Sequence, residues 1–191
     1  MNFITPPAVT VNAPQVIASL RKLVPSRMLT RPQTMLVSEL QAVRLRELLK
    51  ITTPHFPHDV LMNLRGVEIE FDGTIPYSGS THWNGKHWVI VLNATESKYR
   101  QRFSLLHELK HIVDHTTKQH LYGDTPTHAS AKLAEQTADY FAACVLMPET
   151  FVQALCSQGI HGPNLLCKYF EVSQKAMYIR LKHLNLKAEK P

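Results

Sequence analysis

Residues 100–115 read RQRFSLLHELKHIVDH, and this segment constrains the fold more than any other part of the chain. Its apolar positions recur at helical spacing, and His107, His111 and His115 follow one another at intervals of four residues. In an α-helix, side chains four residues apart lie about 40° apart around the axis and about 6 Å apart along it. The histidines therefore form one stripe, which is either a solvated polar face or a binding site.

The spacing within His107-Glu108-Leu109-Lys110-His111 is H-E-x-x-H. Two imidazoles at this spacing can reach one metal ion, and the glutamate projects about 100° away from the first histidine, beside the metal. From there it can take a proton from a water molecule. A polar face of hydrogen-bonding histidines is the alternative interpretation. His115 is turned by about 80° from His107, so we expect it to support the site indirectly or to act at the helix C-terminus.

A catalytic zinc site usually has three protein ligands and one open position. The next predicted helix offers Glu135 as the third ligand and, one turn later, Asp139 as the acceptor for the outer N–H of a ligand histidine. Either carboxylate can instead be an exposed helix charge. We therefore predict Zn²⁺ bound by His107, His111 and Glu135, with Glu108 as the general base.

A hydrolytic site also needs a donor for the oxyanion of the transition state. The sequence leaves four candidates open, namely Tyr140, Tyr122, His120 and His128. We name Tyr140 because it lies close to Glu135 and Asp139 on the predicted second helix. The remaining paired histidines lie beside prolines or a predicted hairpin turn. We expect His55, His58, His82 and His87 in loops or at the surface.

Sequence periodicity predicts an α+β fold. Val67, Ile69 and Phe71 alternate with polar residues, and two further strand-like runs flank Asn84-Gly85, a pair typical of a type I′ hairpin turn. We therefore predict a small three-stranded antiparallel sheet over residues 67–93. Helical periodicity is expected at 15–24, 38–50, 57–66, 97–115, 129–147, 148–159, 163–170 and 173–184. Ser38 is the expected N-cap of the second helix, and residues 116–128 read as a loop.

Composition limits the classes of protein. Hydrophobic residues make up 44% of the 191, which is enough for a sizeable core. The three cysteines are an odd number without a C-x-x-C pair, so we expect reduced, buried thiols in a cytoplasmic protein. We see no secretory signal and no apolar stretch long enough to span a bilayer. The net charge of +6 is compatible with an acidic partner or nucleic acid, or with solubility alone.

The segment RFSLLHELKHIVDH, followed by AEQTADYFAACVLMP, resembles the ImmA/IrrE family of zinc metallopeptidases. The strand ending in IVLN and the tail LLCKYFEVSQKAMYIRLKHLNL are also similar, so the resemblance runs from about Pro54 to Leu186. In that family a glutamate in this position, here Glu135, is the third metal ligand. Lys110 stands where the family usually has glycine, and Asp139 where it usually has asparagine.

The resemblance implies a zincin-like metallopeptidase core in residues 54–158, with an active-site helix and a glutamate-ligand helix, and a basic helix-turn-helix-like pair in residues 159–191. Residues 1–53 would be an N-terminal arm with helices of unassigned role. The implied activity is that of a gluzincin-like zinc endopeptidase. Its implied substrate is a helix-turn-helix transcriptional repressor of a mobile element, phage or stress operon.

Two alternatives stay open at this point. The chain can be a non-proteolytic antirepressor or a toxin-like partner of a repressor. The C-terminal helices can also bind DNA, because Ser173 is placed to cap the second of them and Arg180, Lys182 and Lys187 carry positive charge. We do not favour this interpretation. Neither oligomeric state nor substrate identity follows from the sequence.

Overall fold

The computed structural model describes residues 12–62 and 66–187. Within these residues the chain forms a three-stranded sheet and nine helices, so the α+β class is as predicted. The N-terminal part contains α1 (Ala13–Arg21), α2 (Arg31–Leu48), α3 (His58–Met62) and the strands β1 (Val67–Asp72), β2 (Gly79–Trp83) and β3 (Trp88–Asn93). The remainder contains α4 (Lys98–Asp114), α5 (Lys118–Tyr122), α6 (His128–Leu146), α7 (Glu149–Ser157), α8 (Pro163–Phe170) and α9 (Gln174–His183).

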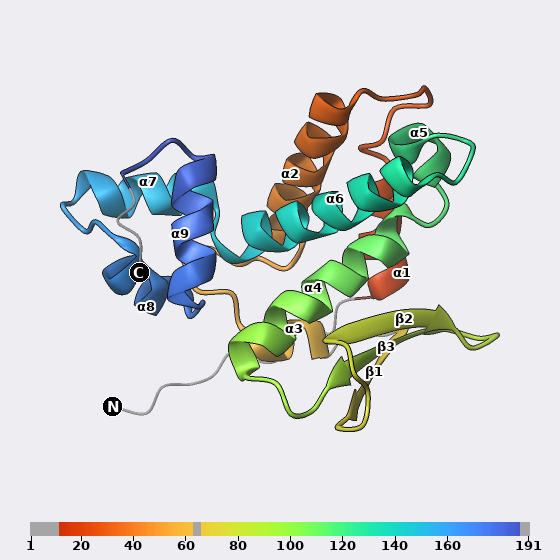
Figure 1. Cartoon of the computed structure of the whole chain (residues 1–191), viewed down its shortest axis with the longest axis horizontal. Coiled ribbons are helices and arrows are strands. Elements are labelled where there is room, and N and C mark those ends of the chain that lie inside the picture. The colour runs from red at the N-terminus through yellow and green to blue at the C-terminus, as the bar shows by residue number, and fades with distance from the viewer. Residues whose placement is uncertain (1–11, 63–65, 188–191) are drawn as a thin grey trace.

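Helices α4 and α6 lie side by side at the centre of the molecule (Figure 1). The sheet packs against α4 through β2 and β3, α2 packs against α6, and α7, α8 and α9 gather at one end. Both central helices have capped N-termini, because the Ser97 hydroxyl accepts from Arg100 N and the Thr127 hydroxyl accepts from Ser130 N. The segment that carries the histidine stripe is thus held between a sheet and a second long helix.

The strand order is β1-β3-β2, and the sheet is mixed. β2 and β3 form the predicted antiparallel hairpin, but β1 runs parallel to β3, with Val67 opposite Trp88. The prediction of a wholly antiparallel sheet is therefore wrong. A period of two reveals which residues share a face but not the direction of a strand. The apolar WVIVLN strand, β3, is central in the sheet, and most of its residues are buried. The outer strands β1 and β2 expose more of their residues.

The hairpin turn has four residues, since Trp83 pairs with Trp88. Gly85 has a positive φ of +97°, whereas Asn84 does not. The side-chain oxygen of Asn84 accepts hydrogen bonds from the backbone N–H groups of Lys86 and His87, both at 3.0 Å. The predicted two-residue type I′ turn is wrong, because this asparagine satisfies the turn through its side chain instead.

Two helical predictions need correction. Helix α2 begins at Arg31 rather than after Ser38, because Gln33 accepts from the backbone N–H of Thr30 at 3.1 Å and starts the helix there. Ser38 is buried inside the helix and donates to Thr34 O at 3.2 Å. The predicted loop 116–128 contains the short helix α5. Ser173, by contrast, accepts from Ala176 N at 3.1 Å and caps α9 as predicted.

One buried hydrophobic cluster extends from Ala13 in α1 to Leu181 in α9, and a second, smaller one includes Leu121 of α5. Burying a leucine such as Leu106 of α4 contributes about 1.5–3 kcal/mol, so α4 is fixed by its apolar positions. The division into residues 1–53, 54–158 and 159–191 stays a prediction. Cys144 and Cys167 are buried free thiols and Cys156 is half-buried. No single described helix has the length and apolarity to cross a bilayer, although the bent pair α6 and α7 meets that criterion jointly.

Candidate metal centre

Three side chains from α4 and α6 converge on one point. His107 Nε2 lies 3.1 Å from His111 Nε2 and 3.2 Å from a carboxylate oxygen of Glu135. His111 Nε2 lies 3.4 Å from the other carboxylate oxygen of Glu135. The two imidazoles are one turn apart on α4, and the glutamate reaches them from the neighbouring helix. The side chain of Glu135 is 63% exposed, so the point of convergence is open to solvent.

These separations fit a tetrahedral metal site. Two donors bound to one zinc ion at about 2.0–2.1 Å lie roughly 3.3 Å apart. The two Nε2 atoms are 3.1 Å apart, each lies 3.2 or 3.4 Å from a different carboxylate oxygen of Glu135, and one candidate ligand atom from each residue lies within 4.8 Å of the others. The set of two imidazole nitrogens and one carboxylate oxygen is also one that zinc accepts. These residues could therefore hold a divalent metal.

Asp139, one turn beyond Glu135, accepts a hydrogen bond from His107 Nδ1 at 2.9 Å. A carboxylate is an acceptor, so the Nδ1 of His107 carries the proton and the lone pair of a neutral ring is on Nε2. That lone pair then faces the Glu135 carboxylate, which is unfavourable unless a proton or a metal ion lies between them. Burial alone would lower the pKa of His107, but Asp139, Glu108 and Glu135 outweigh it and raise that pKa.

Glu108 points toward the sheet. It is 8% exposed, and burial raises the pKa of its carboxyl group. A Cβ placed on Gly79 of β2 would lie 3.3 Å from the Glu108 Cγ, so the glycine lets the strand approach this side chain. Among the described residues no hydrogen bond reaches the Glu108 carboxylate. It is thus free to accept a proton from a group placed between β2 and the histidines.

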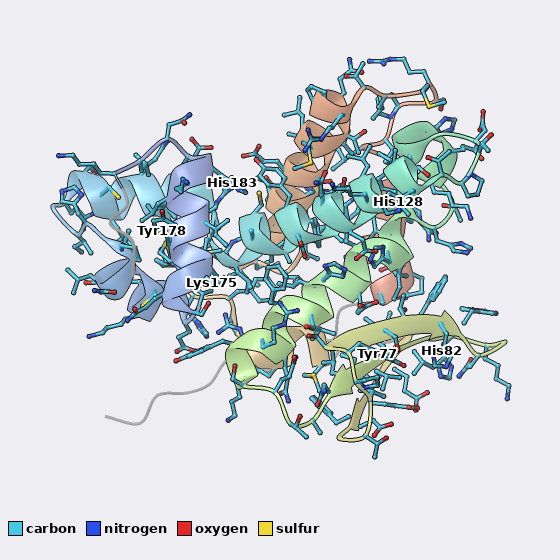
Figure 2. All side chains as sticks on the ribbon, in the orientation of Figure 1. Tyr77, His82, His128, Lys175, Tyr178 and His183 are labelled. Carbon is cyan, nitrogen blue, oxygen red and sulfur yellow. The ribbon has the colours of Figure 1, made fainter. Side chains whose placement is uncertain are left out.

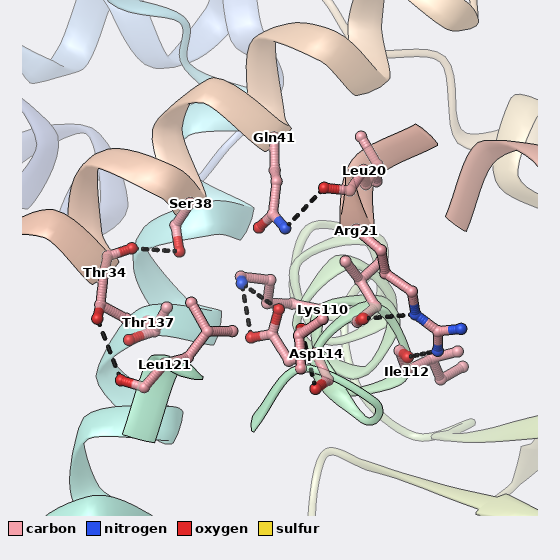
Figure 3. A network of polar contacts seen from close by, with 12 residues as sticks. Leu20, Arg21, Thr34, Ser38, Gln41, Lys110, Ile112, Asp114, Leu121 and Thr137 are labelled. Carbon is pink, nitrogen blue, oxygen red and sulfur yellow. Dashed lines mark hydrogen bonds and ion pairs between the residues drawn. The ribbon is translucent and has the colours of Figure 1, made fainter. Parts of the chain in front are cut away.

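Lys110 lies on the inward face of α4, away from the three convergent side chains. Its side chain is completely buried, and Nζ donates to both carboxylate oxygens of Asp114 at 2.5 and 2.6 Å (Figure 3). The hydroxyl of Tyr122 donates to the same carboxylate. Burial lowers the pKa of Lys110 and the charge of Asp114 partly offsets this. The lysine that departs from the family pattern therefore belongs to an internal polar cluster, with Asp114 and Tyr122, on the buried side of α4.

The other predicted site residues lie away from the point of convergence. The Tyr140 hydroxyl donates to Glu39 of α2 at 3.1 Å, and Tyr122 is bonded to Asp114 in the interior. Burial raises the pKa of both tyrosines. His115 is the C-cap of α4, with its ring 5.0 Å from that of Trp88, so it lies at the helix end and not among the convergent side chains.

The other histidines considered from the sequence also lie elsewhere. His120 is half-buried in α5, and His128 is exposed at the first position of α6 (Figure 2). His82 is exposed on β2, His87 pairs with Glu68 at 2.5 Å, and His55 lies 3.6 Å from Glu171. None of these joins the cluster of candidate ligands within the described chain. His58 begins α3, and its side chain lies outside what the structure describes.

Two residues near the centre were not anticipated. Gly79 lies against Glu108, and a glycine at the start of a strand was the available signal for such a close approach. Arg21 of α1 donates to the carbonyl oxygens of Ile112 and Val113 at 2.7 and 2.9 Å and so satisfies the last turn of α4. No local pattern indicates the latter, because the partners are about ninety positions apart.

A mixed α+β chain that brings an H-E-x-x-H helix and a glutamate of the next helix together has the features of a metallopeptidase-like domain. Residues 67–182 match the peptidase family Peptidase_M78, described as the IrrE N-terminal-like domain. Since the match covers more than half of the 191 residues, the chain belongs to this family. The resemblance to the ImmA/IrrE family is thereby confirmed.

No curated protein matches the sequence. Among solved structures, the chain is similar to a transcriptional regulator from Mycobacterium tuberculosis, with a TM-score of 0.63 and 14% sequence identity. The similarity covers 87% of this chain and 51% of the other, so this chain spans about half the length of that structure. At this identity the likeness establishes the fold alone.

Proposed function

We propose that the protein is a zinc-dependent endopeptidase of the gluzincin type. The single observation that carries the proposal is the convergence of His107, His111 and Glu135 at separations that suit one tetrahedral ion. A structural zinc site usually has four protein ligands, often cysteines. Here three candidate ligands converge beside solvent, and this arrangement favours a site with an open position.

The residues of the site have distinct roles in this proposal. A bound zinc ion would supply the Lewis acidity that activates water and polarises the scissile carbonyl. Asp139 holds the tautomer and orientation of His107 through the Nδ1 hydrogen bond. Glu108 takes the proton from the attacking water and delivers it to the leaving amine. Its burial suits this role, because a raised pKa brings the carboxyl group nearer to neutral pH.

The edge strand β2 is a natural place for the substrate backbone. It pairs with β3 on one side only, and it passes Glu108 at Gly79. An extended peptide added to this edge would lie beside the proposed general base. Tyr140 remains our proposal for the second oxyanion donor, and in that role its hydroxyl would exchange its hydrogen bond with Glu39 for one with the substrate.

For the substrate we propose a helix-turn-helix transcriptional repressor of a mobile element, phage or stress operon, in the cytoplasm. The support is membership of the family and the resemblance of the motifs. DNA binding through α8 and α9 is less favoured. Arg180, one of the three basic residues considered for it, is 1% exposed and donates through Nε to Met147 O at 2.9 Å. A phosphate contact needs an accessible cation.

Substitution of Glu108 by Gln tests the proposal. The variant should bind zinc as the wild type does, because the three candidate ligands are unchanged, and should lose cleavage of the repressor encoded beside this gene by several orders of magnitude. Chelation separates the antirepressor alternative. The hydrophobic cluster forms without the candidate ligands, and the site is open to solvent at Glu135, so metal removal should abolish cleavage and leave the fold intact. If the chelated protein still relieved repression as well as the metal-loaded protein, the non-proteolytic alternative would be supported.

A further inference from the structure

A groove of about 720 Å³ lies between α9 on one side and α2, α4 and α6 on the other. It reaches the candidate metal centre, because Asp139 lines it, and so does Phe103, whose ring centroid is 6.5 Å from that of His107. Lys175 and His183 lie on the side of α9 that faces this space (Figure 2). Pockets of roughly 300–1,000 Å³ hold small ligands, so the groove has room for a few side chains of a bound polypeptide.

The floor of the groove is mostly apolar. It is lined by side chains of four helices and of the turn before α9, among them Met35, Phe103, Ala143, Leu146, Val172 and Ile179. Ile179 is 43% exposed, although the same helix buries Met177 and Leu181 in the core. A partner that placed apolar side chains here would remove this surface from water at about 25 cal/mol per Å².

The charged side chains that line the groove are mostly cationic. Arg31, Arg100 and Lys175 are exposed, whereas the one carboxylate among the lining residues, Asp139, already accepts from His107. Arg100 lies 3.8 Å from Glu96, and Arg31 bonds the neutral side chain of Gln136. Lys175 has neither a hydrogen bond nor an ion pair within residues 12–62 and 66–187. Arg100 is therefore partly neutralised by Glu96, whereas Arg31 and Lys175 carry positive charge with no carboxylate partner in the described part of the chain.

A fourth cation lies in the floor. The Arg180 guanidinium is stacked 5.8 Å from the centroid of the Tyr140 ring, and its Nη1 has no hydrogen-bond partner of good geometry in the described part of the chain. Buried donors are usually paired, and an unpaired one on a charged group is costly. Because Arg180 is only 1% exposed, it adds positive potential at the floor without a direct contact, and a carboxylate entering the groove would pair with the exposed cations of the rim.

We infer that this groove binds a segment of the polypeptide substrate in which a carboxylate side chain stands beside apolar side chains. The inference rests on the proposed peptidase function and assigns the chemical class of the segment that lies on the α9 side of the metal centre. Nucleic acid suits the groove less well. Binding by phosphate contacts needs an extended cationic surface, whereas these cations surround an apolar floor and the carboxylates of Glu135 and Asp139 stand at one end.

The test measures binding rather than cleavage, so it stays informative even if the protein hydrolyses nothing. The full chain carrying Glu108→Gln is titrated against three short fluorescein-labelled peptides in which leucine alternates with glutamate, glutamine or lysine. Fluorescence anisotropy should show the tightest binding for the glutamate peptide. Adding Lys175→Glu should weaken that peptide about five-fold or more and improve the lysine peptide.

The matched control is Lys168→Glu in the same background. Lys168 is exposed on α8 and does not line the groove, and its substitution by glutamate makes the same change in net charge as Lys175→Glu. It should change the affinity for the glutamate peptide less than two-fold. Equal binding of the glutamate and glutamine peptides, or equal effects of the two lysine substitutions, would overturn the inference. So would tight binding of a labelled oligothymidine that Lys175→Glu abolishes, since it would assign the groove to nucleic acid.

Discussion

Replacing Lys110 by Met should destabilise the protein strongly, although the lysine contacts neither of the histidines beside it in the sequence. Its ammonium is completely buried and lies 2.5 and 2.6 Å from the two oxygens of Asp114, which is itself 3% exposed. At an effective dielectric constant of about 20, such a pair attracts by about 6 kcal/mol. The substitution removes this attraction and leaves a buried carboxylate whose remaining donor is the Tyr122 hydroxyl.

Removing one partner of a buried ion pair typically costs about 3–5 kcal/mol. For a chain of this length the loss corresponds to a fall in Tm of roughly 6–20 °C. The assay is urea unfolding of the chelated protein, because bound metal would add its own stabilisation. Combining Lys110→Met with Asp114→Asn should recover about 2 kcal/mol, since asparagine is neutral and can still accept from Tyr122.

The matched control is Arg44→Met. Arg44 and Glu47 also form an intrahelical ion pair, at 3.0 Å, but both are about half exposed, so this change should cost less than about 1 kcal/mol. If Lys110→Met cost no more than Arg44→Met, the lysine would not be a charged partner of Asp114. That result would contradict a buried ion pair between Lys110 and Asp114.

Four further outcomes follow from the same contacts. Asp139→Ala should weaken metal affinity about 10–100-fold in a competition titration, while Asp139→Asn, which keeps an acceptor for His107 Nδ1, should weaken it less; equal losses would show that the hydrogen bond is not the cause. Gly79→Val should lower kcat/KM, because its side chain would meet Glu108, and an unchanged value would place the substrate elsewhere. Burial raises the pKa of the Cys144 thiol to about 11, so iodoacetamide at pH 8 should modify the half-buried Cys156 first and Cys144 only as the pH approaches 11. Faster labelling of Cys144, read by mass spectrometry, would contradict its burial. Arg21→Met should accelerate amide exchange in the last turn of α4, since its carbonyl partners at 112 and 113 lose their side-chain donor.

The candidate ligands could be found from sequence because helix geometry is local. Four residues of α4 bring His107 and His111 onto one face whatever packs around them, and the position of Glu135 on a second helix needed only that the two helices lie side by side. Glu135 was chosen because it lies on the next predicted helix with Asp139 one turn later, and the family resemblance implies the same ligand. The structure then places all three side chains at one point.

The sheet could not be obtained in the same way. Alternation in β1 identifies Val67 and Ile69 as inward-facing residues in either strand direction, so the parallel pairing of β1 with β3 depends on the path of the intervening chain. The turn failed for a related reason. The positive φ at Gly85 was predictable from the residue type, but the role of the Asn84 side chain depends on a loop length that the dipeptide does not determine.

The burial of Lys110 was also beyond local reasoning. Its spacing from Asp114 allows an ion pair on any face of the helix. The pair is internal because α4 packs on α6, where Phe141 lies with its ring centroid 6.0 Å from the ammonium. The groove along α9 also depends on tertiary packing, because Lys175 and Phe103 are far apart in the chain and line the same groove only in the folded protein.

The central claim is that His107, His111 and Glu135 bind one divalent metal ion together. Crystals grown with zinc and measured at its absorption edge test it most directly. We expect a single strong anomalous peak per chain, about 2.0–2.2 Å from both Nε2 atoms and from an oxygen of Glu135. A peak elsewhere, or protein that remains metal-free with Glu135 turned away from the imidazoles, would contradict it.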